Sequence, residues 1–214
     1  MSLSVTPVTA AQLPIIAPLL AAAFDDDPAY RFLFPHAATR PSGLADFFAR
    51  NLGTHLPYRC TYVATEDASV VGTVTIRPPG GVPISLATML RRGLIPFAWS
   101  QGPRAVKRLL LLKREYDALE ERAMGSEPHR LVHMMAIAPN RQGRGLGTRL
   151  LADAIALSVR ARGAASLPIL LTTHTERNVA FYRRSTFAIT ERSELALAGA
   201  AAYPVWIMRR AAAG

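Results

Sequence analysis

Residues 138–151 read APNRQGRGLGTRLL, and three glycines fall within five positions, at Gly143, Gly145 and Gly147. Glycine loses more backbone freedom than any other residue when a chain folds, so such a cluster needs a physical reason. The stretch follows an apolar run typical of a buried strand and precedes an amphipathic run typical of a helix. A strand, a glycine-rich turn and a helix together place unpaired backbone amides at a helix N-terminus, where an anion is favoured. The stretch therefore predicts an anion-binding turn.

Neither of the two common phosphate-binding motifs fits this turn. A P-loop carries a lysine directly after its last glycine, and no lysine follows these glycines. The dinucleotide pattern G-x-G-x-x-G, started at Gly143, would need its third glycine at Thr148. Nearby cations at Arg141, Arg144 and Arg149 still favour an anion. From its own residues, the turn is either an anion site of another kind or a purely structural turn.

The rest of the chain alternates helical and strand-like segments, as in a mixed α/β domain. A capping-box pattern at Thr9 begins the first helix, and two runs of β-branched residues on either side of residues 66–68 predict a hairpin. Helical periodicity predicts a helical insertion at about residues 80–128. We expect one domain over residues 1–214. The expected helices cover 9–24, 32–34, 43–52, 104–122, 145–162 and 177–184, and the expected strands cover 58–65, 69–77, 131–138, 167–173, 187–197 and 203–209.

Composition and charge limit the class of protein. The 214 residues are 50% hydrophobic and 19% charged, which is typical of a globular chain with a sizeable core. The sequence contains no membrane-spanning pattern, and its N-terminus lacks the pattern of a signal peptide. The single cysteine, Cys60, cannot form an internal disulfide, so we expect a cytoplasmic protein. The formal net charge of +10 attracts anions of any kind, including nucleic acid and phosphorylated cofactors.

A family resemblance accounts for the spacing of the glycines. Residues 142–147 read QGRGLG and match the pattern Q/R-x-x-G-x-G/A of the GNAT acetyltransferase superfamily. Residues 136–139 resemble the end of the fourth strand of that family, and Asn178 followed by Tyr182 resembles its second signature. Three further stretches, at residues 24–28, 31–35 and 206–209, resemble the branch that contains puromycin N-acetyltransferase.

The resemblance implies a fold and a cofactor. The fold is a single α/β domain with a mixed sheet and a helical insertion between the third and fourth strands. Acetyl-CoA lies where the fourth and fifth strands separate, with its pyrophosphate on the amides of the glycine turn and its pantetheine arm along the strand edge. No metal is implied. The residues implied in binding acetyl-CoA are Met135, Ala136, Ile137, Gln142, Gly143, Arg144, Gly145, Leu146, Gly147, Thr148 and Asn178; for Asn178, capping of the short helix is the alternative.

The chemistry of acetyl transfer requires a neutral amine, a stabilised oxyanion and a proton for the departing sulfur. The resemblance implies Tyr182 as the general acid, with core packing as the alternative. Leu131 stands where some relatives carry a glutamate base, and His133 lies on the same strand face two residues later. We therefore predict His133 as the base, with His174 as a second candidate. Either histidine could instead be hydrogen-bonded in place without a catalytic role.

Several classes of function remain open at this point. The leading hypothesis is transfer of an acetyl group from acetyl-CoA to a small-molecule amine by direct attack in a ternary complex. A non-catalytic acyl-CoA sensor of the same fold and an enzyme acting on a protein amine are the alternatives. Dispersed arginines without a known nucleic-acid motif argue against nucleic acid. We expect no membrane partner, and a homodimer is left open. The acidic run Asp25–Asp27 either attracts a cationic amine or ends a helix.

Overall fold

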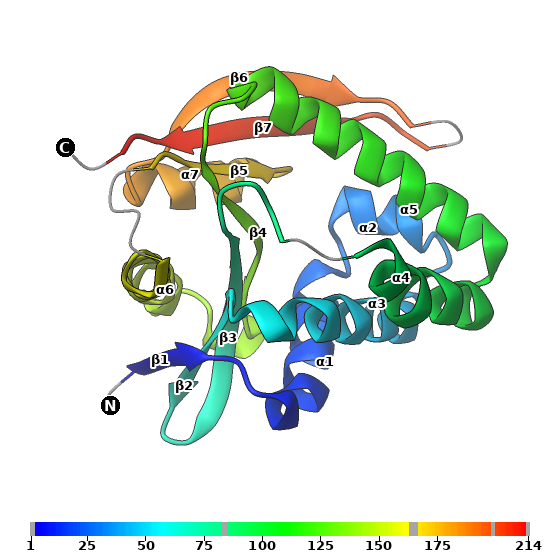
Figure 1. The fold of residues 1–214 in the computed structure, drawn as a ribbon, viewed down its shortest axis with the longest axis horizontal. Helices are drawn as coiled ribbons and strands as arrows, with labels where there is room; N and C mark the ends of the chain where they lie inside the picture. Colours follow the sequence, from blue (N-terminus) through cyan, green and yellow to red (C-terminus); the bar gives the residue numbers. More distant parts are fainter. Residues whose placement is uncertain (1–2, 83–84, 163–166, 198–199, 213–214) are drawn as a thin grey trace.

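One twisted seven-stranded sheet organises the chain (Figure 1). A computed structural model describes residues 3–82, 85–162, 167–197 and 200–212. The strand order is β1-β2-β3-β4-β5-β7-β6, in which β4 and β5 are parallel and all other neighbours are antiparallel. The strands are β1 (Leu3–Pro7), β2 (Thr61–Glu66), β3 (Ser69–Arg77), β4 (Arg130–Ile137), β5 (Ile169–Thr173), β6 (Ala188–Leu195) and β7 (Tyr203–Arg210).

Helices cover both faces of this sheet (Figure 1). Apolar residues of α6 and α7 form one core with the sheet, and those of α1, α2, α3 and α5 form a second core on the opposite face. None of the described helices is long and apolar enough to cross a membrane. The helices are α1 (Leu13–Phe24), α2 (Pro28–Leu33), α3 (Arg40–His55), α4 (Leu86–Thr88), α5 (Ile95–Met124), α6 (Leu146–Arg162) and α7 (Glu176–Arg184), with 3-10 turns η1 (Ala10–Gln12), η2 (Leu56–Tyr58) and η4 (Pro139–Arg141) and a π-helical stretch η3 (Met89–Leu94).

Local signals in the sequence explain how several elements begin and end. The backbone amide of Thr9 donates to the side chain of Gln12 at 2.9 Å, as the capping box predicted, and η1 and α1 follow. The hairpin of β2 and β3 turns at Asp67 and Ala68, whose φ values of 48° and 62° are those that a tight hairpin turn requires. Asp27 caps α2 by accepting from the amide of Ala29 at 3.0 Å.

The predicted mixed sheet and the helical insertion between β3 and β4 are confirmed. The insertion consists mainly of α5, which is kinked at Gly102 (φ 80°) directly before Pro103. The edge strand β1 was not among the segments predicted from local pattern. It is five residues long, and its pairing with β2, rather than its own sequence, defines it as a strand. The predicted alanine-glycine turn before β7 includes residues 198 and 199, which lie outside the described residues.

The parallel pair β4 and β5 separates part of the way along its length. Arg130–Val132 pairs with Ile169–Leu171, but β4 continues to Ile137 and β5 to Thr173 without further pairing between them among the described residues. On its other side, β4 contains a bulge at His133. The consecutive β3 residues Thr75 and Ile76 pair with Met134 and Val132, so His133 lies between the two paired residues of β4. The carboxyl ends of two parallel strands thus diverge, which is where open α/β sheets bind ligands.

Candidate active site

The three glycines of the turn have two different physical reasons. Gly143 and Gly145 have φ values of 79° and 74°, which side chains rarely tolerate. Gly147, in the first turn of α6, faces the ring of Phe181 in α7, and a Cβ atom on it would lie 3.2 Å from that ring. The turn therefore has an exposed left-handed backbone that leads into the N-terminus of α6, directly after β4.

Gln142 attaches this turn to two neighbouring elements. Its side-chain nitrogen donates to the carbonyl of Ile137 at the end of β4, at 3.1 Å. Its side-chain oxygen accepts from the guanidinium of Arg177 in α7, at 2.6 Å. Because both ends of the amide are used, the Gln142 side chain links the turn to β4 and to α7.

A buried carboxylate, which the sequence did not indicate, holds two of the predicted cations. Glu66 lies at the end of β2 with its side chain 6% exposed, and its Oε2 is 3.3 Å from guanidinium nitrogens of both Arg141 and Arg144. These arginines thus orient the turn as ion-pair partners of Glu66. The third cation, Arg149, is exposed on the first turns of α6.

The predicted cofactor residues fall into two groups that meet at the separation of β4 and β5. Met135, Ala136 and Ile137 lie on β4 beyond its last pair with β5, so that edge of their backbone has no strand partner among the described pairs. Leu146 and Thr148 lie in the first turn of α6, where amides have no partner within the helix. The Leu146 side chain is buried, so only its backbone could meet a ligand, whereas Thr148 is exposed.

Tyr182 reaches the same separation from α7. Its hydroxyl lies 4.0 Å from the sulfur of Met135, and its ring packs against Phe181 and Phe187. Burial raises the pKa of Tyr182 above the usual value of a tyrosine, so the hydroxyl is protonated at neutral pH. A protonated hydroxyl at this place has the state that a general acid needs.

Asn178 does not cap the short helix. The cap of α7 is Thr175, whose hydroxyl accepts from the amide of Asn178 at 3.2 Å. The capping alternative for Asn178 was therefore wrong. Its exposed side chain is left for the predicted contact with acetyl-CoA, which stays a prediction.

His133 occupies the bulge of β4, on the face covered by α3. Its ring stacks on that of His55 at the end of α3, with the centroids 5.7 Å apart. Desolvation lowers the pKa of His133 to about 3, and the neighbouring His55 and Arg77 lower it further. The His133 residue is nevertheless exposed to solvent. At neutral pH His133 is therefore an uncharged, weakly basic imidazole.

His174 directly follows β5 and belongs to a hydrogen-bonded group of polar side chains. Its Nδ1 lies 2.8 Å from a carboxylate oxygen of Asp27, and its Nε2 lies 2.6 Å from the hydroxyl of Tyr116 in α5. The Tyr116 hydroxyl also lies 3.4 Å from that of Tyr203 at the start of β7. Local sequence patterns could not predict this cluster, because 147 positions separate Asp27 from His174.

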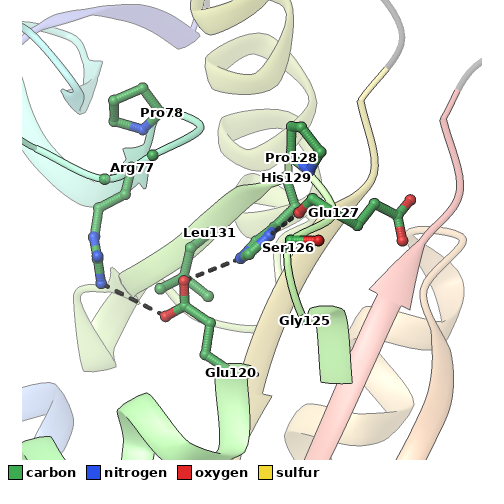
Figure 2. A pocket seen from close by; sticks show the side chains of 11 residues that line it. Arg77, Pro78, Glu120, Gly125, Ser126, Glu127, Pro128, His129 and Leu131 are labelled. Atoms are coloured by element: carbon green, nitrogen blue, oxygen red, sulfur yellow. Dashed lines mark hydrogen bonds and ion pairs between the residues drawn. The ribbon is translucent and has the colours of Figure 1, made fainter. Parts of the chain in front are cut away.

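A pocket of about 370 Å³ opens on the α5 face of the sheet, at the start of β4 (Figure 2). Figure 2 shows the carboxylate of Glu120 between Arg77, at 3.9 Å, and His129, at 3.0 Å. Leu131, which the resemblance placed where some relatives carry a glutamate, lines this pocket, whereas the predicted base His133 is not among its lining residues. The volume of the pocket is in the usual range for small-molecule sites. The lining residues are Arg77, Pro78, Gly80, Gly81, Glu120, Gly125, Ser126, Glu127, Pro128, His129 and Leu131.

Comparison with known proteins gives one family and a common fold. Residues 22–187 match the acetyltransferase (GNAT) family. No curated protein sequence matches the chain. Among solved structures, a protein of Corynebacterium glutamicum named as a histone acetyltransferase and related acetyltransferase is 20% identical, with 100% of this chain and 98% of that chain covered and a TM-score of 0.66. The Drosophila melanogaster polyamine N-acetyltransferase that forms N-acetylagmatine is 18% identical, with 98% and 100% covered and a TM-score of 0.62. The C-terminal condensation domain of Ebony, solved with beta-alanyl-dopamine, is 10% identical, with 99% of each chain covered and a TM-score of 0.68.

Proposed function

Because the chain belongs to the acetyltransferase (GNAT) family, we propose that it transfers an acetyl group from acetyl-CoA to the amine of a small molecule within a ternary complex. One observation carries the proposal: β4 and β5 separate directly beside a left-handed glycine turn, and Tyr182 lies at that separation. We further propose that the chain acts as a single domain. The narrower resemblance to the puromycin branch stays a prediction.

The residues at the separation suit the two parts of acetyl-CoA. The amides of the turn and of the first turn of α6 would bind the pyrophosphate, with the hydroxyl of Thr148 as a further donor. The free edge of β4 at Met135–Ile137 would hydrogen-bond the amides of the pantetheine arm, as a sheet edge pairs with an extended peptide. Gln142 and Arg144 would fix the turn in the conformation that binds.

The proposed reaction needs proton transfers and a hydrogen bond to the oxyanion from the protein. The neutral amine attacks the thioester carbonyl, a C–N bond forms, and the C–S bond then breaks to release coenzyme A. A β4 amide would donate to the oxyanion, and Tyr182 would give its proton to the departing sulfur. His133 stays the sequence-based prediction for the base. Its lowered pKa makes it a poor proton acceptor.

The acceptor would approach from the α5 face. The pocket of Figure 2 lies there, and its Glu120 carboxylate could attract a cationic amine. Structural neighbours named as polyamine, agmatine and arylalkylamine N-acetyltransferases support an amine of low molecular weight as the acceptor. The sheet and helix arrangement is shared with these proteins, and the acceptor itself is our proposal.

Calorimetric titration with acetyl-CoA, followed by thiol release against a panel of small amines, tests the proposal. We expect binding and release, and Tyr182→Phe should lower kcat about 10- to 100-fold while leaving the Kd for acetyl-CoA unchanged. Tight binding without release from any small amine, including polyamines, would contradict the enzyme and favour a sensor. Release only with a peptide amine would favour a protein substrate.

Two glycines provide a matched control for the binding turn. Gly145 (φ 74°) and Gly102 (φ 80°) are both left-handed, and a Cβ on either would meet open space. Gly145→Ala and Gly102→Ala should therefore each lower the free energy of unfolding, by about 1–3 kcal/mol, with the larger loss at Gly102, whose ψ of 166° is strained for any residue other than glycine. Only Gly145→Ala should also raise the Kd for acetyl-CoA. Unchanged affinity in Gly145→Ala would show that the turn does not bind the cofactor.

A further inference from the structure

The His174 cluster has a fixed direction of hydrogen bonding. A carboxylate only accepts, so Asp27 requires Nδ1 of His174 to carry a proton. The other nitrogen, Nε2, is then an acceptor, and the hydroxyl of Tyr116 donates to it. Tyrosine, histidine and aspartate thus stand in the same donor order as the residues of a Ser-His-Asp triad, which is recognised by its geometry rather than by the fold.

The cluster also lies where the acceptor must arrive. His174 is the first residue after β5, beyond the last pair of β5 with β4. Tyr116 and Tyr203 pack on the core beneath α5, whereas Tyr182 and Met135 pack on the opposite core, beneath α6 and α7. Two sets of polar groups therefore reach the separated strands from opposite faces of the sheet.

The pocket of Figure 2 lies on the α5 face of the sheet, and one of its lining residues, Glu120, is one helical turn of α5 away from Tyr116 of this cluster. Glu120 is four residues after Tyr116 in α5, and residues at that spacing lie on the same face of a helix, about 6 Å apart. An amine that enters beside Glu120 and moves one helical turn along α5 would reach the hydroxyl of Tyr116.

We propose that Tyr116, His174 and Asp27 form the proton relay that deprotonates the acceptor ammonium, an inference that rests on the proposed acetyl transfer. The ammonium N–H proton passes to the Tyr116 oxygen as Tyr116 passes its own proton to Nε2 of His174. The products are a neutral amine, ready to attack the thioester, and an imidazolium that faces the Asp27 carboxylate. Tyr116 is the catalytic residue that touches the amine, and Asp27 is a positioning residue.

The surroundings of the two histidines favour His174 as the group that holds this proton. The titratable side chains that face the cluster are Asp27 before α2, Tyr30 in α2, Tyr116 in α5 and Tyr203 at β7. Of these, Asp27 is the carboxylate, and one of its oxygens lies 2.8 Å from Nδ1 of His174, so it is placed beside the charge of an imidazolium. Burial raises the pKa of Tyr116 well above its usual value, so its hydroxyl stays protonated and passes protons on.

The opposite holds at His133. Its neighbours are His55 and the Arg77 guanidinium, and a positive charge on His133 would be disfavoured by both. No carboxylate forms an ion pair or hydrogen bond with its ring among the described contacts. Of the two histidines, His174 is the one that has a carboxylate beside its ring among the described contacts, so we assign the ammonium proton to it.

If the relay operates, the loss of kcat/KM in a Tyr116 variant must depend on the basicity of the acceptor amine. A purely structural role of Tyr116 predicts no such dependence. We would measure kcat/KM for thiol release from pH 6 to pH 9, with an aliphatic amine and with its fluorinated analogue, which is already neutral at pH 7. For the aliphatic amine, Tyr116→Phe should lower kcat/KM about 10- to 100-fold at pH 7. The difference in kcat/KM between the wild type and Tyr116→Phe should shrink about tenfold for each unit by which the pH rises. The variant uses only the neutral amine in solution, and the neutral fraction of an aliphatic amine rises about tenfold per pH unit in this range. For the fluorinated amine the loss should be under about threefold.

Matched variants separate the relay from its surroundings. Tyr203→Phe removes a neighbouring hydroxyl without breaking the two hydrogen bonds of His174 and should keep the wild-type pH profile. Asp27→Asn keeps a cap for α2 and an acceptor for Nδ1 but removes the charge, and it should reproduce the pH-dependent deficit. Binding of acetyl-CoA, measured by calorimetry, should be unchanged in all three variants and serves as the check of folding.

Three results would overturn the relay. Tyr116→Phe could have wild-type rates, or it could lose the same factor at every pH and for both amines. His133→Gln could show the pH-dependent deficit in place of Tyr116→Phe, which would return the base to His133. In each case thiol release by the wild type would leave the proposed function intact. If no amine supports release by the wild type, the proposed function fails and the relay fails with it.

Discussion

Gly147 in α6 faces the ring of Phe181 in α7 so closely that a Cβ atom on the glycine would lie 3.2 Å from an atom of the ring. The two helices that border the proposed cofactor site therefore pack through a glycine. Phe181 is in turn next to Tyr182, with ring centroids 4.9 Å apart. A change in the spacing of α6 and α7 would thus be transmitted to the proposed general acid.

We expect Gly147→Ala to lower the free energy of unfolding by about 1 kcal/mol, because the added methyl group must displace the Phe181 ring. Gly53→Ala is the matched control: Gly53 lies in α3, and a Cβ there meets nothing within 4 Å. Alanine is the better helix former, so Gly53→Ala should raise the free energy of unfolding by up to about 1 kcal/mol. Urea denaturation of both variants measures the difference, and equal effects would show that the contact with Phe181 is not limiting.

A second prediction about the same turn concerns the side chain of Gln142. Gln142→Ala removes the hydrogen bonds to the Ile137 carbonyl and from Arg177, at 3.1 and 2.6 Å. The turn then loses its fixed conformation, and we expect the Kd for acetyl-CoA to rise about tenfold. Asn140→Ala, in the adjacent turn η4, is the control, since no hydrogen bond of its exposed side chain is described. Calorimetry should find the control unchanged; an equal loss in both would mean that the side chain of Gln142 has no special role.

The glycine turn was predictable because its physics is local. The positive φ values of Gly143 and Gly145 belong to the turn itself, and the spacing of the residues already indicated them. Gly147 differs, because its reason is the ring of Phe181, thirty-four residues later. The spacing in the sequence singled out Gly147, but it could not predict that the glycine faces the ring of Phe181.

The parts of the candidate site that could not be predicted from the sequence depend on tertiary contacts. Glu66 was predicted only as part of the turn between two strands, and its contacts with Arg141 and Arg144 join residues more than seventy positions apart. Tyr116 was predicted as part of an amphipathic helix, and its contact with His174 depends on how α5 crosses the sheet (Figure 1). Asp27 was given as either an attractor of amines or the end of a helix; it caps α2 and also binds His174.

His133 and His55 give a prediction about pH. Burial lowers the pKa of His55, and the pKa of His133 is lowered to about 3, so the folded state binds fewer protons than the unfolded chain below pH 6.5. Their contribution to stability is thus complete above about pH 6.5 and is lost as the pH falls towards 3. We expect the ring signals of both histidines in an NMR titration to show no transition near pH 6.5. In His133→Gln, the free energy of unfolding should fall less steeply as the pH is lowered from about 6.5 towards 3. A transition of the His133 ring signals near pH 6.5 would contradict the prediction.

The ion pairs of Glu66 yield the last prediction. The Glu66 carboxylate is 6% exposed, whereas the side chains of Lys113 and Asp117, paired on the surface of α5, are 59% and 55% exposed. Water weakens the second pair, so a double-mutant cycle with Lys113→Met and Asp117→Asn should give a coupling energy of at most about 0.5 kcal/mol. The corresponding cycle with Glu66→Gln and Arg141→Met should give a larger coupling energy, about 1 kcal/mol, because the Glu66 carboxylate is buried; Arg144 still pairs with it in Arg141→Met, which limits the loss. Adding salt should reduce the coupling on α5 more than the coupling at Glu66. Equal coupling energies in the two cycles would mean that Glu66 does not hold the glycine turn in place.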